Sequence, residues 1–376
     1  MRKTAFLYSQ LLSQHVLSDT HPMRPIRLQH TYDLLNSYDV FNESSVRLVH
    51  PRHASPEELS LIHSQDYISA VESLSIGTEE FDSDRYGFSA RGDNPVYRGM
   101  YEAATLSTGS SLIAAELINS RNVDIAFNIS GGLHHAMRSS ASGFCIFNDP
   151  AIAIKYLIGQ GKRVAYIDVD AHHGDGVQQA FYNNNNVLTI SIHESGQYLF
   201  PGTGFSNETG ANNADGYSIN LPLFPYTTDD IYVWAFEQTV IPIVQAFKPD
   251  VIVAQLGIDT YYSDPLTHLH ITSSGYERIV QHIIEFDVPL LALGGGGYDV
   301  LAVARCWSLA FAKMSGIHLP NKIPKSFSKN HNLNVLRDTI EIDLPDDMRE
   351  MVNGTAEKSI EYIKQNCFPT HKIREG

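Results

Sequence analysis

The stretch YIDVDAHHGDGV, residues 166–177, sets acidic and imidazole side chains directly after an apolar run. Within it, Asp170 and His172 are two residues apart, so an extended backbone points both to the same side and lets both reach one ion. Asp259, which follows the apolar run VIVAQLG, is a candidate third ligand. An Asp, His and Asp set suits Zn²⁺ or Fe²⁺ and leaves coordination positions for water and substrate. A solvated loop with a capping Asp before a helix is the alternative interpretation of this pattern.

Two further histidines, His134 and His135, are adjacent in SGGLHHA. Next to a metal-activated water, two neighbouring imidazoles offer a general base and a general acid. Their second ring nitrogens need carboxylate partners, and Asp168 and Asp175 are the remaining acids of the 166–177 stretch. For His173 we expect packing or capping, not catalysis.

Four glycines, residues 294–297, precede Tyr298. They lack the G-x-G-x-x-G spacing and the terminal Lys-Ser/Thr of phosphate-binding loops, so a nucleotide site is not expected. Such a loop can approach a ligand closely, and a Tyr hydroxyl on it can donate a hydrogen bond to an oxyanion. Together with the candidate metal, these residues predict metal-assisted amide hydrolysis. Cys145 is a rival nucleophile, which we interpret as structural.

Short apolar runs alternate with amphipathic segments along the chain. The predicted strands are TAFLYS (4–9), DIAFNI (124–129), RVAYIDV (163–169), VLTISIH (187–193), YSINLPL (217–223), DVIVAQLG (250–257) and PLLALGG (289–295). The predicted helices include 99–118, 148–160, 229–247 and 272–286, with a further helix at 355–366 in a polar tail. Apolar strands separated by helices predict a parallel sheet that is covered on both faces. Loops at the carboxyl ends of such strands converge on one crevice, where we expect 130–136, 168–176, 257–265 and 294–299 to meet.

The composition is that of an ordinary globular protein, with 43% hydrophobic and 18% charged residues in a chain of 376. A net charge of −15 repels phosphate backbones and anionic lipids, so neither nucleic acid nor a membrane is expected as a partner. No apolar run approaches the roughly 20 residues of a membrane span. Three cysteines predict no disulfide framework, and a cytoplasmic location fits these features.

Six segments resemble the signature segments of the histone deacetylase superfamily, and they occur in the same order. They are SGGLHHA, GFCIFND, DVDAHHGDGV, FPGTG, QLGIDTYYSDP and GGGGY. The resemblance covers roughly residues 5–315 and is strongest to the bacterial acetoin-utilisation-type deacetylases, which HPMRPIRL and GDNPVYRGMYEAA also resemble. It implies a single three-layer α/β/α domain of the arginase/deacetylase type around an eight-stranded, mainly parallel sheet. The whole chain, 1–376, would form this domain, with 316–376 as a C-terminal extension packed on the core.

The resemblance also implies a role for individual residues. Zinc, or Fe²⁺ in vivo, would be bound by Asp170, His172 and Asp259. His134 and His135 would be the tandem histidines, with His135 favoured as the general base. Their carboxylate partners would be Asp168 and Asp175, and Tyr298 would be the oxyanion donor.

Further implied roles concern a second ion and the substrate. A structural potassium ion would be held by Asp168 and Ser191 and by main-chain oxygens of Asp170, His172 and Ile192. The acyl-lysine tunnel would be lined by Gly143, Phe144 and Phe200. Asp93 would grip substrate backbone amides at the rim, and Arg27 would lie beside an internal cavity through which acetate leaves.

The implied activity is hydrolysis of the acetyl amide of acetyl-lysine in a protein, such as the metabolic enzyme acetyl-CoA synthetase. Leu133 stands where many eukaryotic members have Trp, as in the acetoin-type group. Arginase-like ureohydrolases with two Mn²⁺ ions are a rival, but they carry Asp where Gly174 and Tyr261 stand. Deacetylation of an acetylpolyamine or another acetylated small molecule would use the same machinery. This alternative stays open, because the acidic stretch 77–84 lies near the expected rim of the site. A non-catalytic acyl-lysine binder would not need the intact cluster of titratable residues.

Overall fold

Eight parallel strands form the centre of the protein, for which a computed structural model describes residues 2–14, 17–18, 20–78, 80–90 and 92–374. The strands are β1 (Thr4–Leu7), β2 (Val46–Val49), β3 (Ile125–Asn128), β4 (Val164–Asp168), β5 (Val187–Glu194), β6 (Ser218–Leu223), β7 (Val251–Gln255) and β8 (Leu290–Leu293). Their spatial order is β2-β1-β3-β8-β7-β4-β5-β6, and every neighbouring pair is parallel. The predicted single-domain sheet is therefore confirmed, and it is parallel throughout.

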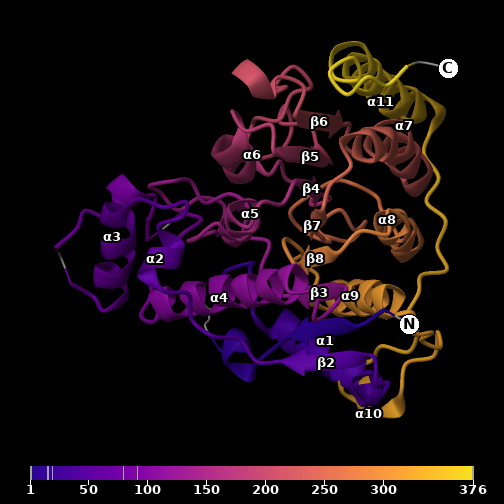
Figure 1. Cartoon of the computed structure of the whole chain (residues 1–376). Helices are drawn as coiled ribbons and strands as arrows, with labels where there is room; N and C mark the ends of the chain where they lie inside the picture. Colours follow the sequence, from indigo (N-terminus) through magenta and orange to yellow (C-terminus); the bar gives the residue numbers. More distant parts are fainter. Residues whose placement is uncertain (1, 15–16, 19, 79, 91, 375–376) are drawn as a thin grey trace.

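Helices cover both faces of this sheet (Figure 1). Alternate strand residues point to opposite faces, so in β4 Ala165 and Ile167 enter one core, while Val164 and Tyr166 enter the other. The first core is closed by α1 (Ile26–Ser37), α7 (Asp229–Phe247), α8 (Ser273–Glu285) and α9 (Val300–Ser315). The second core is closed by α4 (Met100–Asn119), α5 (Asp149–Gly159) and α6 (Asp175–Phe181). The result is the three-layer α/β/α arrangement that the sequence predicts.

Apart from the C-terminal helix, the predicted elements form within a few residues of their expected bounds. All seven predicted strands and the helices expected at 99–118, 148–160, 229–247 and 272–286 are present. The sequence analysis did not find β2, whose four residues VRLV lie at the edge of the sheet and are mostly half-exposed or exposed. An edge strand lacks the continuous apolar run that marks a buried strand.

Beyond the second core, a third cluster extends the molecule past α4. It is built on α2 (Pro56–Leu59) and α3 (Gln65–Ser75), and Tyr67 packs there among Phe88 and Phe147. The Tyr67 hydroxyl donates to the carbonyl of Ile146 at 2.7 Å. This cluster therefore supports the segment that carries the GFCIFND motif.

The C-terminal segment folds back over the domain. Its helices are α10 (Lys325–His331) and α11 (Asp346–Asn366), so the helix predicted at 355–366 begins earlier, at Asp346. Helix α11 packs on β6 and α7, where the Ser359 hydroxyl donates to the Pro222 carbonyl at 2.9 Å. The division of the chain at residue 315 stays a prediction.

Short 3₁₀ helices complete the description of the fold. They are Gln10–Ser13, Val40–Asn42, Asp84–Tyr86 and Asn212–Ala214. The last part of the acidic stretch 77–84 leads into the third of these helices, and residue 79 of the stretch lies outside the described residues. Within the described ranges, no helix combines the length and the apolar character needed to cross a bilayer.

Candidate active site

The four chemically dense segments meet at the carboxyl ends of neighbouring central strands. They follow β3, β8, β7 and β4, which lie side by side in the sheet. Direct bonds join them: the Gln255 side-chain amide donates to the Gly132 carbonyl at 3.2 Å, and the Ile258 N–H donates to the Gly296 carbonyl at 2.9 Å. From β4 the chain continues to β5 and β6 on one side, and from β7 it continues to β8 on the other. Such a reversal is where parallel sheets open a crevice. The predicted convergence is therefore present.

Asp170, His172 and Asp259 form a buried group with the spacing of metal ligands. One ligand atom from each residue lies within 4.8 Å of the others. The His172 Nδ1 lies 3.1 Å from Asp170 Oδ1 and 2.9 Å from Asp259 Oδ2. All three residues are buried, and two carboxylates with one imidazole are a donor set that divalent zinc or iron accepts.

The outer oxygens of both carboxylates are held by donors, which leaves the inner ones facing His172. Asp170 Oδ2 accepts from the Gln255 amide and from the Gly296 N–H, both at 2.7 Å. Asp259 Oδ1 accepts from the Ala171 N–H at 2.8 Å. Such bonds fix the orientation of a ligand carboxylate before an ion arrives, so the residues present fit a divalent cation.

The charges in this group also favour a cation. Burial alone would lower the pKa of His172, but the carboxylates of Asp259 and Asp170 hold that pKa well above its ordinary value. The imidazole thus carries the positive charge that two buried carboxylates require. A metal ion would supply that charge instead and displace the proton.

His134 and His135 each pair with a carboxylate and face each other. The His134 Nδ1 lies 2.7 Å from Asp168 Oδ2, and the His135 Nδ1 lies 2.7 Å from Asp175 Oδ1. The two Nε2 atoms are 3.0 Å apart. Each carboxylate fixes the tautomer of its histidine, so the free Nε2 atoms are directed to one point.

Their surroundings push the pKa values of these two histidines apart. For His134, burial alone would lower the pKa, but Asp168 and Asp170 raise it to about 9. For His135, burial and the neighbouring His134 charge lower the pKa well below its ordinary value. Burial raises the pKa of Asp175 to about 6. One protonated and one neutral imidazole therefore lie side by side at neutral pH.

The glycine loop brings Tyr298 to the same place. Gly295 and Gly297 have φ values of 124° and 133°, and a side chain at Gly296 would overlap the Asp259 carboxylate. The Tyr298 N–H donates to Asp264 Oδ2 at 2.8 Å. Burial and the nearby Asp259 and Asp170 charges raise the pKa of Tyr298 well above its ordinary value, so its hydroxyl stays protonated.

The residues expected to line the tunnel surround the histidines. The Phe200 ring lies 5.0 Å from the His135 ring and 6.4 Å from the His172 ring, and it is 42% exposed at the surface. The Phe144 ring lies edge-on to Tyr298 at 5.8 Å. A side chain at Gly143 would overlap the His135 ring, so only glycine leaves this approach open.

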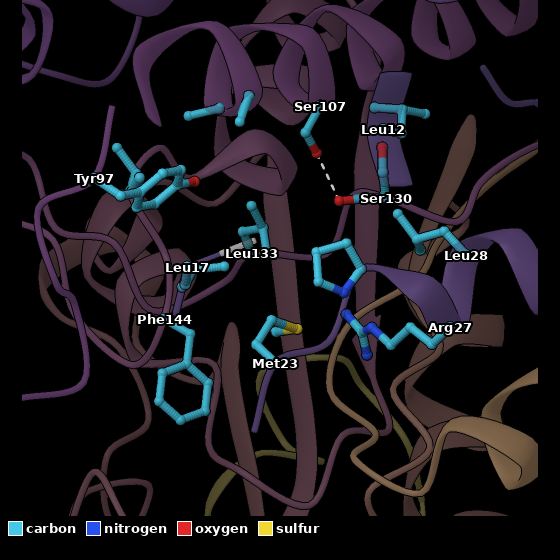
Figure 2. A pocket seen from close by; sticks show the side chains of 14 residues that line it. Leu12, Leu17, Met23, Arg27, Leu28, Tyr97, Ser107, Ser130, Leu133 and Phe144 are labelled. Carbon is cyan, nitrogen blue, oxygen red and sulfur yellow. Dashed lines mark hydrogen bonds between the residues drawn. The ribbon is translucent and has the colours of Figure 1, made fainter. Parts of the chain in front are cut away.

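A cavity of about 100 Å³ is lined by Phe144, Leu133 and Arg27. Figure 2 shows Arg27 entering it among apolar side chains such as Met23 and Leu28. The Arg27 guanidinium donates to the Gly297 carbonyl at 3.0 Å and lies over the Trp307 ring. Arg27 thus lies beside a cavity and touches the loop that carries Tyr298.

Asp93 is less closely tied to the site than the other predicted residues. It is exposed, and its main-chain oxygen lies 3.1 Å from the His21 Nε2. The His21 ring packs against Phe144 at 4.6 Å. Asp93 is therefore connected to Phe144 through His21.

The residues of the predicted potassium site come from the 168–172 segment at the end of β4 and from the neighbouring strand β5. Among the described residues, the carbonyl oxygens of Asp170 and His172 accept no hydrogen bond. The Ser191 hydroxyl lies 2.8 Å from His193 Nδ1, and the Ile192 carbonyl accepts from the Tyr232 hydroxyl at 3.3 Å. Buried carbonyls need a partner, so the two unbonded oxygens fit a monovalent cation.

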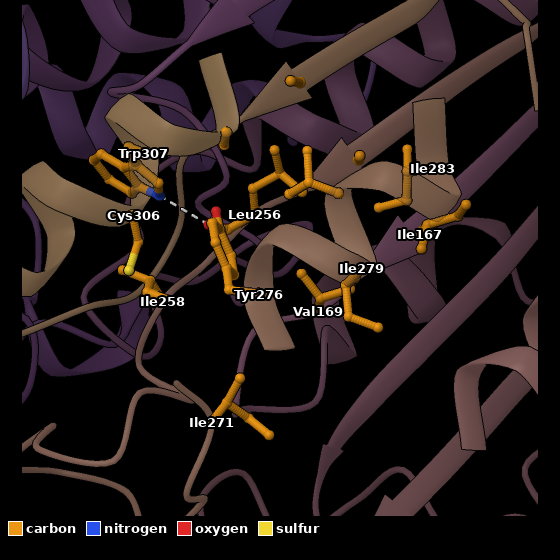
Figure 3. Close-up of a cluster of buried hydrophobic side chains, with 14 of the residues drawn as sticks. Ile167, Val169, Leu256, Ile258, Ile271, Tyr276, Ile279, Ile283, Cys306 and Trp307 are labelled. Carbon is orange, nitrogen blue, oxygen red and sulfur yellow. Dashed lines mark hydrogen bonds between the residues drawn. The ribbon is translucent and has the colours of Figure 1, made fainter. Parts of the chain in front are cut away.

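Asp259 owes its position to the packing behind β7. Figure 3 shows Trp307 and Tyr276 reaching the same point at the end of that strand. The Trp307 indole N–H and the Tyr276 hydroxyl both donate to the Leu256 carbonyl, at 2.8 and 2.9 Å. The strand end is therefore fixed three residues before Asp259.

Two rival interpretations of the site find no support in the geometry. The Cys145 thiol is buried and donates to the Gly143 carbonyl at 3.2 Å, and burial raises its pKa well above its ordinary value, so it is a poor nucleophile. Tyr261, where a ureohydrolase has Asp, donates to Asp338 at 2.7 Å.

His173 lies 2.8 Å from the Thr203 hydroxyl and holds a loop, in line with its expected packing role.

Sequence reasoning missed several residues that hold the site together. Gln255, Asn148, Asp149 and Asp264 are all buried and bond to the segments that carry the candidate catalytic groups. Asn148 and Asp149 end the GFCIFND motif, so their place in a signature segment was the available signal.

The fold and the site define the class of protein. A family model described as the histone deacetylase domain matches residues 21–314. The chain belongs to the histone deacetylase family.

Individual relatives agree with this family. The acetoin utilization protein AcuC of Bacillus subtilis (strain 168) is 44% identical over 334 residues, which cover 86% of this chain and 85% of AcuC. Human histone deacetylase 1 is 35% identical over 373 residues, which cover 98% of this chain and 74% of the human protein. The crystal structure of a histone deacetylase homologue from Aquifex aeolicus has a TM-score of 0.86 at 31% identity, and the match covers 96% of this chain and 100% of that one.

Proposed function

We propose that this protein hydrolyses the acetyl amide of acetyl-lysine in proteins and releases acetate. The observation that carries the proposal is the meeting of the Asp170, His172 and Asp259 group with the paired imidazoles of His134 and His135. A neutral and a protonated histidine beside a candidate metal site provide the base and the acid that amide hydrolysis needs.

The cofactor that we propose is a zinc or Fe²⁺ ion bound by Asp170, His172 and Asp259. When bound, the ion would polarise the acetyl carbonyl and lower the pKa of a water molecule. The bonds from Gln255, Gly296 and Ala171 hold the outer carboxylate oxygens in place for it.

The reaction then depends on the side chains around the acetyl group. His135, which is neutral, takes the proton of the attacking water through its Nε2. Tyr298, which stays protonated, donates its hydroxyl hydrogen bond to the developing oxyanion. His134, which is protonated, gives a proton to the departing lysine amine. Asp168 and Asp175 keep both rings in the orientation that this exchange requires.

We assign the substrate contacts and the second ion as part of the same proposal. Gly143, Phe144 and Phe200 would enclose the lysine stem, Asp93 would accept from substrate backbone amides, and Arg27 would face the departing acetate. A potassium ion would be held by Asp168, Ser191 and the carbonyl oxygens of Asp170, His172 and Ile192. The unbonded carbonyls of Asp170 and His172 support this assignment.

We propose an acetylated metabolic enzyme, such as acetyl-CoA synthetase, as the protein substrate, because AcuC is the relative named for acetoin utilization. A cytoplasmic location is part of the proposal, supported by three buried cysteines that form no disulfide. An acetylpolyamine or another acetylated small molecule is the alternative substrate class.

The test uses purified, metal-defined protein, an acetyl-lysine peptide and acetylated putrescine or spermidine, with acetate release as the measurement. We expect release from the peptide that stops with a zinc chelator and returns on adding the metal. Release from the polyamines alone would move the function to small-molecule deacetylation. No release from either substrate with metal bound would contradict the proposal.

A further inference from the structure

Two adjacent residues at the start of α5, Asn148 and Asp149, hold the backbone of the loop that carries His134 and His135. Asn148 is the N-cap of α5 and Asp149 is the first residue of that helix. Neither has any exposed surface. They are the last two residues of the GFCIFND segment, and no step of the proposed reaction uses them.

Asp149 binds the loop just before the histidines. Its Oδ1 accepts from the Leu133 N–H at 2.8 Å, and its Oδ2 accepts from the Gly132 N–H at 3.1 Å. The Ser111 hydroxyl is a third donor, at 2.5 Å from Oδ2. A side chain at Gly131 would overlap this carboxylate. The carboxylate therefore fixes two consecutive peptide groups at the entrance to the histidine pair.

Asn148 binds the loop at and just after the histidines. Its side-chain N–H₂ donates to the carbonyls of His134 and Ala136, at 3.1 and 3.0 Å. Its side-chain oxygen accepts from the Ala151 N–H at 2.9 Å and caps α5. One amide thus connects the helix and the loop, so a shift of the loop would break the cap as well.

These contacts act on the backbone, whereas Asp168 and Asp175 act on the rings. The carboxylates restrain the rotation of each ring, but the position of the ring, and so of its Nε2, also depends on the backbone that carries it. We propose that Asn148 and Asp149 are positioning residues, which set the backbone of 132–136 so that both imidazoles point at the reacting amide. This inference rests on the proposed function, because only that reaction gives the position of the two imidazoles a catalytic consequence.

Three variants separate positioning from stability. Asp149→Asn replaces one acceptor oxygen with a donor that faces an N–H or hydroxyl. Asn148→Asp keeps the oxygen that caps α5 but turns a second oxygen toward the carbonyls of His134 and Ala136. Ser111→Ala is the matched control, because it removes one bond to Asp149 and one from the Asn128 amide, while the bonds from Gly132 and Leu133 to Asp149 remain.

The first measurement is hydrogen–deuterium exchange on peptides that cover 129–136 in the full-length, metal-loaded protein. We expect faster exchange in Asp149→Asn and Asn148→Asp, and unchanged exchange in Ser111→Ala despite its lower Tm. This readout needs no turnover. It therefore tests the clamp, by which we mean the contacts of Asn148 and Asp149 with residues 132–136, even if the chain has a different substrate. Unchanged exchange in both clamp variants would overturn the inference.

The second measurement is kcat and KM on the acetyl-lysine peptide. We expect kcat to fall by about 10²-fold in both clamp variants, with KM within about twofold and metal content unchanged. Ser111→Ala should keep its kcat. An equal loss of kcat in Ser111→Ala, or faster exchange with normal kcat in the clamp variants, would show that the residues only stabilise the fold. Inactive wild-type protein would count against the proposed function, whereas active wild type with active variants would count against the clamp.

Discussion

At the scale of single residues, the site is defined by which atoms are left free. Asp170 and Asp259 each use one oxygen on protein donors and keep the other for His172 and a cation. His134 and His135 each use Nδ1 on a carboxylate and keep Nε2 for the reaction. Because a protein partner holds one end of each side chain, the other end points in a defined direction. A few residues are therefore enough to form the candidate site.

Tyr298→Phe tests the oxyanion role at this scale. Removing one donor to an oxyanion costs about 10²–10³ in kcat, so we expect such a loss with metal content unchanged. Acetate release and metal analysis on the same preparation provide the measurement, with Tyr362→Phe on α11 as the control substitution. Full activity in Tyr298→Phe would remove this residue from the mechanism.

Gln255→Leu tests how the ligand carboxylate is held. Gln255 is fully buried and donates to Asp170 Oδ2. Loss of such an outer contact lowers metal affinity by about 10–100-fold. Competition with a chromophoric chelator measures this, and Gln238→Leu, on α7, serves as the control. Equal affinities for wild type and Gln255→Leu would mean that the Gly296 N–H alone orients Asp170.

At the scale of elements, strand ends and helix starts place the site. β3, β4, β7 and β8 deliver the reactive segments to one edge of the sheet, and the start of α5 holds the histidine loop. The segment before α3 contributes to the same region, because the buried His63 Nε2 accepts from the Asn148 N–H at 2.9 Å. The site therefore depends on contacts between elements that are far apart in the sequence.

His63 makes the stability of this contact depend on pH. Burial lowers its pKa from 6.5 to about 4, so between these values the unfolded chain binds the proton and the folded protein does not. Its contribution to stability is present above pH 6.5 and is lost as the pH falls toward 4. At pH 5 the loss is about 2 kcal/mol.

The measurement is urea unfolding at pH 7 and pH 5 for wild type and His63→Gln, whose amide oxygen can still accept from the Asn148 N–H. We expect the wild type to lose about 2 kcal/mol more than the variant between the two pH values. Buried acids such as Asp149, whose pKa burial raises to about 6, titrate in both proteins and cancel. Identical pH dependence would exclude His63 as the source.

At the scale of the whole molecule, the C-terminal segment is attached behind the Asp259 loop. Asp338 forms a buried ion pair with Arg305 on α9 and accepts from the Tyr261 hydroxyl at 2.7 Å and the Ser273 N–H at 2.9 Å. Tyr261 follows Asp259 by two residues. The polar tail thus contacts the elements that place a candidate metal ligand.

Arg305→Met should destabilise the folded protein by about 3–5 kcal/mol, because it leaves the Asp338 carboxylate buried without its partner. Adding Asp338→Leu should recover much of this loss, since the uncompensated charge is then gone. Thermal or urea unfolding of the two single variants and the double variant gives the coupling energy. Purely additive effects would show that the ion pair contributes no coupling.

The sequence by itself determined the chemistry and the sheet. The relevant patterns are Asp, His and Tyr side chains at strand ends and apolar runs at regular intervals, and both depend only on local composition and spacing. The structure contains the strands and the Asp and His group that these patterns predicted. Such patterns predicted seven of the eight strands of the parallel sheet and the meeting of four segments. They also proposed the candidate metal ligands, the paired histidines and Tyr298, whereas the tunnel and rim residues followed from the family resemblance.

Only the tertiary structure decided which residues hold that chemistry in place. Gln255 and Asn148 both lie in signature segments, but nothing in those segments says that one contacts Asp170 and the other the histidine loop. Their contacts cross between segments, 85 residues apart for Gln255 and Asp170. A sequence pattern records neighbours along the chain, whereas a hydrogen bond requires atoms within about 3 Å in space, and folding alone brings those atoms together.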